Sequence, residues 1–201
     1  MMSDHYYSEN PTVQSNKKSW TYDLAGHSFT FRSDSGVFSK NEVDFGSKVL
    51  IEAFEMPEAD GKILDMGCGY GPIGLALAKK WPSRDVDMAD VNSRAVELAK
   101  ENAELNQISN AEIFQSNLFE HVKGKEYSAI LTNPPIRAGK SVVHEILEKS
   151  YEYLRAGGEL WVVIQKKQGA PSAAAKMEEH FDEVDVVQKK KGYYIIRAKK
   201  D

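Results

Sequence analysis

From Lys62 onward, short apolar runs alternate with longer segments whose apolar residues recur at helical spacing. We expect strands at residues 63–66, 86–90, 111–114, 127–132 and 160–164, and helices at residues 73–80, 92–106, 143–154 and 171–181. Gly157 and Gly158 are expected to end the third of these helices. Strands that alternate with helices in this way predict a mostly parallel sheet with helices on both faces.

The two flanks of this region follow other patterns. Residues 20–24 and 29–32 alternate between polar and apolar around Ala25-Gly26, which predicts a β-hairpin, and an apolar segment at 49–54 favours a helix. Residues 184–187 and 193–197 flank Lys191-Gly192 and predict an antiparallel pair at the sheet edge. We therefore divide the chain into an N-terminal extension (1–55) and a main α/β domain (56–201).

The composition is that of an ordinary globular protein, with 41% hydrophobic and 28% charged residues. A formal net charge of -4 argues against a protein that coats nucleic acid by bulk charge, although local basic patches remain. Cys68 is the only cysteine and the histidines are scattered, so we expect no disulfide and no metal site. No apolar run approaches the roughly 20 residues that span a bilayer, and the polar amino terminus is unlike a signal peptide. A cytoplasmic protein without a membrane partner fits best.

The first strand of the α/β region runs into a glycine-rich loop, residues 64–74 (LDMGCGYGPIG). The spacing of Gly69, Gly71 and Gly74 also matches the dinucleotide-binding fingerprint, so spacing alone does not identify the ligand. Asp65 would repel a pyrophosphate but attract the cationic amino group of an amino-acid-like cofactor. Pro72 begins the helix without an N–H to offer an anion. The loop therefore favours a cofactor with an amino-acid part, and a purely structural turn is the alternative.

The next two strands also end in polar residues. Asp90 follows the second strand, where a carboxylate can accept both hydroxyls of a ribose, although a helix-capping aspartate is the alternative. Asn117 follows the third strand, where its amide could meet an adenine amino group with Leu118 packed on the ring. An asparagine in a turn would look the same.

Residues 133–136 (Asn-Pro-Pro-Ile) follow the fourth strand. The prolines make the backbone rigid and leave the carbonyl of Pro134 facing the ligand site. If the Asn133 amide oxygen and a main-chain carbonyl accept the two N–H bonds of an aromatic amine, its nitrogen turns pyramidal and its lone pair points at an incoming methyl group. Positioning and electrostatics then supply the rate without a strong base. A structural Asn-Pro turn is the alternative.

Together, these segments resemble the class I S-adenosylmethionine-dependent methyltransferases. Residues 35–39 (SGVFS), 44–47 (DFGS) and 132–140 (TNPPIRAGK) narrow the resemblance to the bacterial 16S rRNA guanine-N2 methyltransferases of the RsmC type. The resemblance covers nearly the whole chain and corresponds to the catalytic one of the two tandem domains that many members have. It implies an α/β, Rossmann-like fold with a mostly parallel seven-stranded sheet of order 3-2-1-4-5-7-6, helices on both faces and an N-terminal hairpin.

The same resemblance implies methyl transfer from S-adenosylmethionine to the N2 amine of a guanosine in 16S rRNA, in the helix-34 region of the small ribosomal subunit. The catalytic residues are then Asn133, Pro134, Pro135 and Ile136. The cofactor-binding residues are Asp65, Gly67, Cys68, Gly69, Gly71, Asp90, Val91, Asn117, Leu118 and Asn133. The substrate-binding residues are Phe38 and Ser39, in a lid over cofactor and base, with Arg137 and Lys140, which we expect to contact phosphate.

Two positions depart from the family pattern. Ile136 stands where many amino-methyltransferases carry an aromatic residue that stacks on the base, so we expect a flipped base to lean on Phe38 instead. Asn117 replaces the acid that is usual at that strand end, which keeps hydrogen bonding but removes a charge.

Other functions remain as alternatives. With the same cofactor, the enzyme could instead methylate a protein glutamine amide or adenine N6. In methyltransferases that act on those acceptors, however, the four-residue motif that corresponds to residues 133–136 usually ends in an aromatic residue. A non-catalytic RNA-binding or assembly factor could retain the fold, but the intact Asp65, Asp90 and Asn133 argue against it. A nicotinamide dehydrogenase would explain the glycine spacing but not the segment at 133–136.

Overall fold

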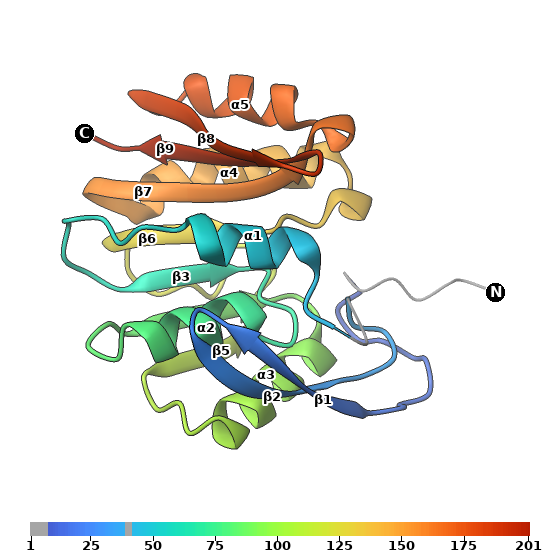
Figure 1. The fold of residues 1–201 in the computed structure, drawn as a ribbon. Coiled ribbons are helices and arrows are strands. Elements are labelled where there is room, and N and C mark those ends of the chain that lie inside the picture. Colours follow the sequence, from blue (N-terminus) through green and yellow to red (C-terminus); the bar gives the residue numbers. More distant parts are fainter. Residues whose placement is uncertain (1–7, 39–41) are drawn as a thin grey trace.

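The computed structural model describes residues 8–38 and 42–201 (Figure 1). The strands of its main sheet are β3 (Ile63–Met66), β4 (Val86–Asp90), β5 (Ala111–Gln115), β6 (Tyr127–Thr132), β7 (Leu154–Gln165), β8 (Glu183–Lys190) and β9 (Tyr193–Lys199). They lie in the order β5-β4-β3-β6-β7-β9-β8. Numbered from β3, this is the predicted order 3-2-1-4-5-7-6. The strand β9 runs antiparallel to both of its neighbours, as expected for the terminal pair.

Helices cover both faces of this sheet and create two cores (Figure 1). One face carries α1 (Phe45–Ala53), α2 (Pro72–Lys80) and α3 (Ser93–Leu105), and the other carries α4 (Lys140–Tyr153) and α5 (Ala170–Glu178). Successive strand residues point to opposite faces, so Ile63 packs in the first core and its neighbour Leu64 in the second. All residues of β3 and β6 are buried, as their apolar runs predict. The Rossmann-like α/β fold is thus confirmed.

The predicted hairpin consists of β1 (Lys18–Leu24) and β2 (His27–Ser33). Ala25 and Gly26 have φ of 51° and 78°, the left-handed pair that a two-residue hairpin turn needs. The hairpin lies against α3, where Asn102 and Asn106 each exchange two hydrogen bonds with the backbone of β2 at 2.7–2.9 Å. Its aromatic residues pack into the core around α1 to α3. The described part of residues 1–55 therefore shares a core with the α/β region, and the boundary at residue 55 stays a prediction.

Several element boundaries differ from the sequence-based expectation, and two of the differences have a clear local cause. The helix predicted to end at Gly157 and Gly158 ends at Tyr153, and these glycines lie inside β7, beside a register shift in its pairing with β6. A Cβ on Gly158 would lie 2.8 Å from the carbonyl oxygen of Tyr127, so the glycine allows the strands to approach. Helix α1 also begins four residues before the predicted Val49, because Asp44 caps its amino end.

Within the described ranges, none of the helices has the length and apolar composition that a membrane span requires.

Candidate active site

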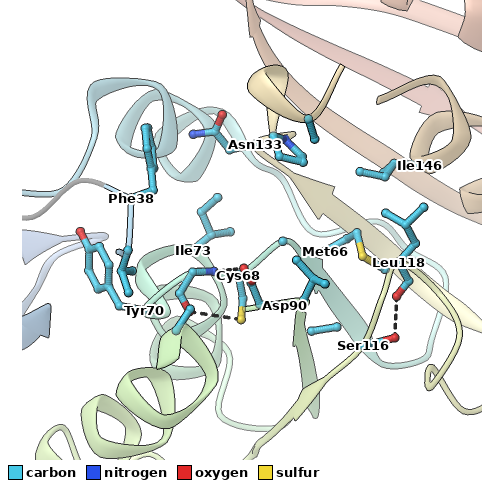
Figure 2. A pocket seen from close by; sticks show the side chains of 18 of the residues that line it. Phe38, Met66, Cys68, Tyr70, Ile73, Asp90, Ser116, Leu118, Asn133 and Ile146 are labelled. Atoms are coloured by element: carbon cyan, nitrogen blue, oxygen red, sulfur yellow. Dashed lines mark hydrogen bonds between the residues drawn. The ribbon is translucent and has the colours of Figure 1, made fainter. Parts of the chain in front are cut away.

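A cavity of about 300 Å³ lies at the carboxyl ends of β3, β4, β5 and β6 (Figure 2). Ligands of open α/β sheets bind at this edge, near the point where the strand order reverses. The volume is at the lower end of the range for small-molecule sites. The cavity is lined by Val37, Phe38, Asp44, Ser47, Met66, Gly67, Cys68, Gly69, Tyr70, Pro72, Ile73, Ala89, Asp90, Val91, Ala95, Ser116, Asn117, Leu118, Asn133, Pro135, Ala138, Val142 and Ile146.

The glycine loop joins β3 to α2 along this cavity. Residues 67–70 and Pro72 line it, whereas Gly71 does not and instead caps the amino end of α2, with φ of 106°. Side chains rarely adopt that backbone conformation, so a glycine is required there. Gly74 is required for packing, because a Cβ on it would lie 2.7 Å from the side chain of Met88 on β4. The loop therefore combines a left-handed turn with close contact between helix and strand.

Asp65 supports this loop from behind and does not line the cavity. Its side chain is fully buried, and its Oδ2 accepts the N–H of Gly74 at 2.7 Å. Its other oxygen has no hydrogen-bond partner among the described residues. Burial, with a smaller contribution from the charge of Asp90, raises the pKa of Asp65 to about 7 despite the opposing effect of the bond from Gly74. The predicted contact of Asp65 with a cofactor amino group stays a prediction.

Asp90 lines the cavity at the end of β4. Its Oδ2 accepts the N–H of Gly69 and its Oδ1 accepts the N–H of Asn92, both at 2.8 Å. Burial raises the pKa of Asp90 to about 6, although these backbone N–H groups lower it. The capping residue of α3 is Asn92, whose side chain accepts the N–H of Ala95 at 3.0 Å. Asn92, and not Asp90, therefore caps α3, which excludes the alternative role that the sequence analysis gave to Asp90.

The segment after β5 contributes three residues to the cavity. Leu118 adopts a left-handed φ of 51°, and its carbonyl accepts the hydroxyl of buried Ser116 at 2.7 Å. The exposed amide of Asn117 donates to Glu120 at 3.1 Å. Leu118 is thus placed to pack against a ligand, and the adenine contact of Asn117 stays a prediction.

The side-chain amide of Asn133 is held by two residues at the start of α1. Its Nδ2 donates to Oδ2 of Asp44 at 2.8 Å and to Oγ of Ser47 at 3.0 Å. A carboxylate only accepts hydrogen bonds, so the NH₂ group must face Asp44 and the amide oxygen must face elsewhere. All three side chains line the cavity, and within the described ranges no protein donor engages that oxygen. It is thus available to accept an N–H from a ligand.

The other residues of the Asn-Pro-Pro-Ile segment divide between cavity and core. Pro135 lines the cavity, whereas Pro134 is buried and does not. Ile136 begins a short 3₁₀ helix, η1 (Ile136–Ala138), and packs against the core around α4 and α5. Arg137 and Lys140 are exposed beyond the cavity, where η1 leads into α4. The structure thus directs Ile136 away from the ligand.

The segment before α1 that was predicted to form a lid completes the cavity. Val37 and Phe38 line it, and Phe38 is 46% exposed. The amide of Asn92 donates to the carbonyl of Gly36 at 2.9 Å, so the loop after Asp90 holds the lid. In Figure 2, Phe38 and Asn133 lie toward one part of the cavity, and Asp90 lies toward another. The predicted Ser39 lies outside the described residues.

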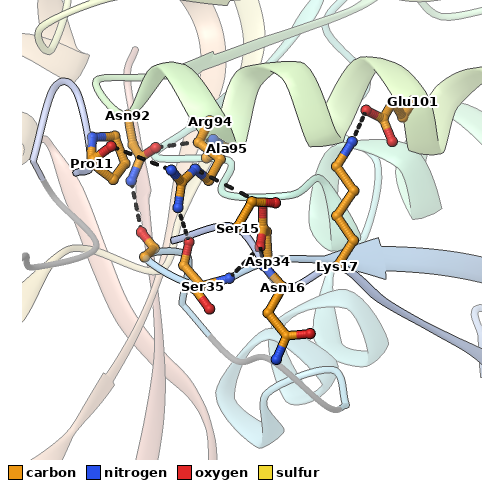
Figure 3. A network of polar contacts seen from close by, with 11 residues as sticks. Pro11, Ser15, Asn16, Lys17, Asp34, Ser35, Asn92, Arg94, Ala95 and Glu101 are labelled. Carbon is orange, nitrogen blue, oxygen red and sulfur yellow. Dashed lines mark hydrogen bonds and ion pairs between the residues drawn. The ribbon is translucent and has the colours of Figure 1, made fainter. Parts of the chain in front are cut away.

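A polar network anchors the lid from its outer side (Figure 3). Arg94 on α3 donates to the carbonyl of Ser35 at 2.7 Å and lies 3.9 Å from the carboxylate of Asp34. Burial by itself raises the pKa of Asp34, but hydrogen bonds from Ser15, Asn16 and Ser35 outweigh it, so the pKa is lowered. The network connects the N-terminal segment, the lid and the helix that follows Asp90.

The structure also adds residues that sequence reasoning did not place in the site. Asp44 and Ser47 belonged to a segment quoted only for its family resemblance, and Tyr70 belonged to the glycine loop. The spacing Asp-x-x-Ser at a helix start was the only local signal, and it indicates a cap. Of histidine, cysteine, aspartate and glutamate, no group of three in residues 8–38 and 42–201 is arranged to hold a metal ion.

The sheet order, the glycine loop after β3 and the acid after β4 define a Rossmann-like α/β protein whose ligand cavity lies where the strand order reverses. The family model of the Methyltransferase small domain matches residues 28–197, and the chain belongs to that family.

Relatives of known sequence agree with this assignment. A Bacillus subtilis (strain 168) protein, described as uncharacterized and called YbxB, is 66% identical over 200 residues, which is 99% of this chain and 100% of that protein. Ribosomal RNA small subunit methyltransferase C of Vibrio cholerae is 33% identical over 187 residues, which is 91% of this chain and 53% of the relative. The chain thus spans about half the length of the methyltransferases C that it matches.

Among solved structures, the Thermus thermophilus 16S rRNA N2 G1207 methyltransferase (RsmC), in complex with AdoMet and guanosine, is similar to this chain with a TM-score of 0.83 and 25% identity. The match covers 95% of this chain and 52% of that one. A methyltransferase from Pyrococcus furiosus shares the fold with a TM-score of 0.65 at 21% identity.

The cofactor of this family is S-adenosylmethionine, and the cavity fits it. Residues 67–69 line the cavity, and because two of them are glycines, Cys68 is the only one with a side chain, which is small. The carboxylate of Asp90 is held on the cavity lining, and Leu118 offers an apolar surface nearby. These are the features that the amino-acid, ribose and adenine parts of such a cofactor need.

Proposed function

We propose that this protein transfers a methyl group from S-adenosylmethionine to the exocyclic N2 amine of a guanosine in the helix-34 region of 16S rRNA. The name of the Vibrio cholerae relative supports small-subunit rRNA as the substrate, and that of the Thermus thermophilus structure supports the N2 of a guanosine. The single observation that carries the proposal is the amide of Asn133, whose NH₂ group is occupied by Asp44 and Ser47. Its oxygen is left to accept an N–H, and an amine that needs orienting is the matching substrate.

In this proposal, the cofactor binds along the ends of β3, β4 and β5. Asp90 accepts the two ribose hydroxyls, Leu118 packs on the adenine, and the loop around Gly67 and Gly69 lies against the amino-acid part. When bound, S-adenosylmethionine supplies an electrophilic methyl group on a positively charged sulfur. Asp65 contributes partial negative charge behind the loop near neutral pH, and its Oδ1, which has no partner among the described residues, leaves that charge incompletely compensated.

The guanine amine binds at the other part of the cavity. The Asn133 oxygen accepts one of its N–H bonds and a main-chain carbonyl of the same segment accepts the other, which frees the nitrogen lone pair from the ring. The carboxylate of Asp44, 2.8 Å from the amide nitrogen, polarises the amide and increases the negative charge on its oxygen. That oxygen then stabilises the positive charge that develops on the amine, and the methylated nitrogen loses its proton to water.

The base reaches this position by flipping out of the RNA. Phe38 stacks on it from the lid, because Ile136 packs into the core and is not available for stacking. Arg137 and Lys140, exposed at the start of α4, contact the phosphates next to the flipped nucleotide.

Tritiated methyl transfer tests the proposal. We expect label from S-adenosylmethionine in small-subunit RNA lacking this modification, on guanosine N2 when the nucleotide is identified by mass spectrometry. Naked 16S rRNA, assembled subunits and a release-factor protein serve as parallel acceptors, and Asn133→Ala is the inactive control. Label in the protein or on adenine N6 would overturn the guanine assignment, and absence of cofactor binding in calorimetry would overturn the activity.

A further inference from the structure

A cluster of five lysines lies at the carboxyl edge of the sheet, outside the cavity. Lys189 and Lys190 end β8, Lys191 lies in the turn between β8 and β9, and all three lysines are exposed. The 3₁₀ helix η2 (Lys166–Gln168) lies beside this turn, since the N–H of Lys166 donates to the carbonyl of Gly192 at 2.9 Å. It adds the exposed Lys166 and Lys167. We call these five residues the lysine surface.

The lysine surface lies close to the part of the cavity that contains Asn133. Both are in contact with the start of α1. Tyr193, which begins β9, packs its ring on Phe45 at 5.6 Å between centroids. The Nζ of Lys191 lies 5.0 Å from the centroid of the same Phe45 ring. The residue before Phe45 is Asp44, which holds Asn133. In Figure 1, the turn between β8 and β9 lies at the same edge as the start of α1.

The positive charge of this surface is largely uncompensated. Within residues 8–38 and 42–201, only Lys190 of the five forms an ion pair, with Glu52 at 3.4 Å. The acids of the same hairpin lie at its other end, where Glu183 and Asp185 pair with Arg197 at 2.9 and 2.8 Å. A protein of net charge -4 thus concentrates basic residues beside its cavity.

Two of the lysines are also held in place by aromatic rings. Lys191 lies over Phe45, and Lys189 lies over Tyr194 at 4.9 Å from the ring centroid. Such contacts fix the long side chains and reduce the entropy that they lose on binding an anion. Basic groups interleaved with aromatic rings suit a nucleic-acid strand better than a small anion.

We propose that the lysine surface binds the phosphates of the RNA strand that flanks the methylated nucleotide. This inference rests on the proposed function and supplies its docking site. A base flipped into the cavity leaves the phosphates on either side of it at the rim. Arg137 and Lys140 contact the phosphates on one side of the base in the proposed function, and the lysine surface, which contacts the start of α1, takes those on the other side.

The test removes four of these charges together, in the variant K166A/K167A/K189A/K191A. We expect its affinity for unmethylated 16S rRNA, transcribed in vitro, to fall at least about tenfold in filter binding at moderate salt. The slope of log affinity against log salt should become less steep by roughly 0.7 for each phosphate that the variant no longer neutralises. The KM for RNA should rise, whereas turnover at saturating RNA and cofactor affinity in calorimetry should match the wild type.

The matched control is K80A/K100A/K123A/K125A, which removes the same charge from exposed positions elsewhere. It should keep wild-type RNA affinity. Equal loss in the control, or wild-type affinity and salt slope in the four-lysine variant, would overturn the lysine surface. Guanosine methylation by the wild type is scored separately. Its absence would refute the proposed function, while a loss of RNA affinity confined to the four-lysine variant would still support the surface.

Discussion

The cavity has two parts that are built in different ways. On the cofactor side, at the ends of β3, β4 and β5, carboxylates accept backbone N–H groups of the adjoining loops, as Asp90 does from Gly69 and Asn92. On the amine side, at the end of β6, one side-chain amide is held by two other side chains. Asn133 and Asp44 are 89 residues apart in the sequence, and they meet only because α1 packs over the end of the sheet.

This difference predicts different responses to substitution. Backbone groups keep their direction when a side chain changes, so substitutions on the cofactor side should act mainly through charge and pKa. The amide on the amine side has no such support, and losing one partner lets it rotate. Substitutions there should therefore reduce turnover more than they reduce binding of the cofactor.

The largest expected effect follows loss of the amide itself. Asn133→Ala should lower turnover by about 10²–10³-fold, as removal of one preorganised hydrogen bond to a developing charge does in other enzymes. Cofactor affinity in calorimetry should change only a few-fold. Single-turnover transfer of a tritiated methyl group measures the effect. A variant with wild-type turnover would exclude Asn133 from the chemistry.

Asp44→Asn should have the next largest effect, because it removes a charged acceptor from the Asn133 amide. A hydrogen bond to a charged group contributes about 1.5–3 kcal/mol, which corresponds to roughly 10–100-fold in turnover. Asparagine caps helices as well as aspartate does, so the melting temperature should hold. Ser47→Ala, which removes a neutral acceptor, should cost less than about tenfold. A loss of stability equal to the loss of activity would indicate a purely structural role.

On the cofactor side, Asp90 should make cofactor affinity depend on pH. With a pKa raised to about 6 by burial, its carboxylate is ionised at neutral pH and protonated in mild acid. Affinity should therefore fall as the pH drops through 6, by up to about tenfold per pH unit. Asp90→Asn should bind more weakly at neutral pH without this step. Calorimetry at pH 5, 6 and 7.5 compares the two, and an identical pH profile would contradict the ribose role.

The smallest expected effect is on stability. Since the pKa of Asp65 is raised to about 7, this group favours the folded state in acid, and its contribution is lost as the pH rises toward and through 7. The asparagine in Asp65→Asn would not titrate and could still accept the N–H of Gly74. Between pH 6 and 8, the free energy of unfolding of the wild type should therefore decrease by about 1 kcal/mol relative to that of the variant. Urea denaturation at both pH values measures this decrease, and a constant difference would show that Asp65 does not titrate there.

Most of the fold was predictable because its elements leave local marks in the sequence. A strand buried on both faces, such as β6, needs a continuous apolar run, and a strand-to-helix turn such as that at Gly71 needs a residue that tolerates a left-handed backbone. The glycines at 157 and 158 misled the prediction because glycine marks helix ends and strand irregularities alike. Only the pairing of β7 with β6 distinguishes the two.

The site was predictable to the extent that its residues follow strand ends. Asp90 and Asn133 could be placed at the cavity because parallel strands end at one edge. Ile136 could not be placed, since the direction of its side chain depends on the packing of η1 and α4. The positions of Arg137 and Lys140 were predicted beside the tetrad, but their distance from the cavity depends on the same packing.

By itself, the sequence determined the order of elements, the glycine loop and the acids and amide at the strand ends, because each depends on residues close together in the chain. Only the tertiary structure decided that Asp44 and Ser47 orient Asn133, that Asp65 lies behind the cavity and that η2 lies beside the turn between β8 and β9. Those interactions join segments far apart in the sequence, and their geometry is set by how helices and hairpins pack on the sheet, which no local pattern records.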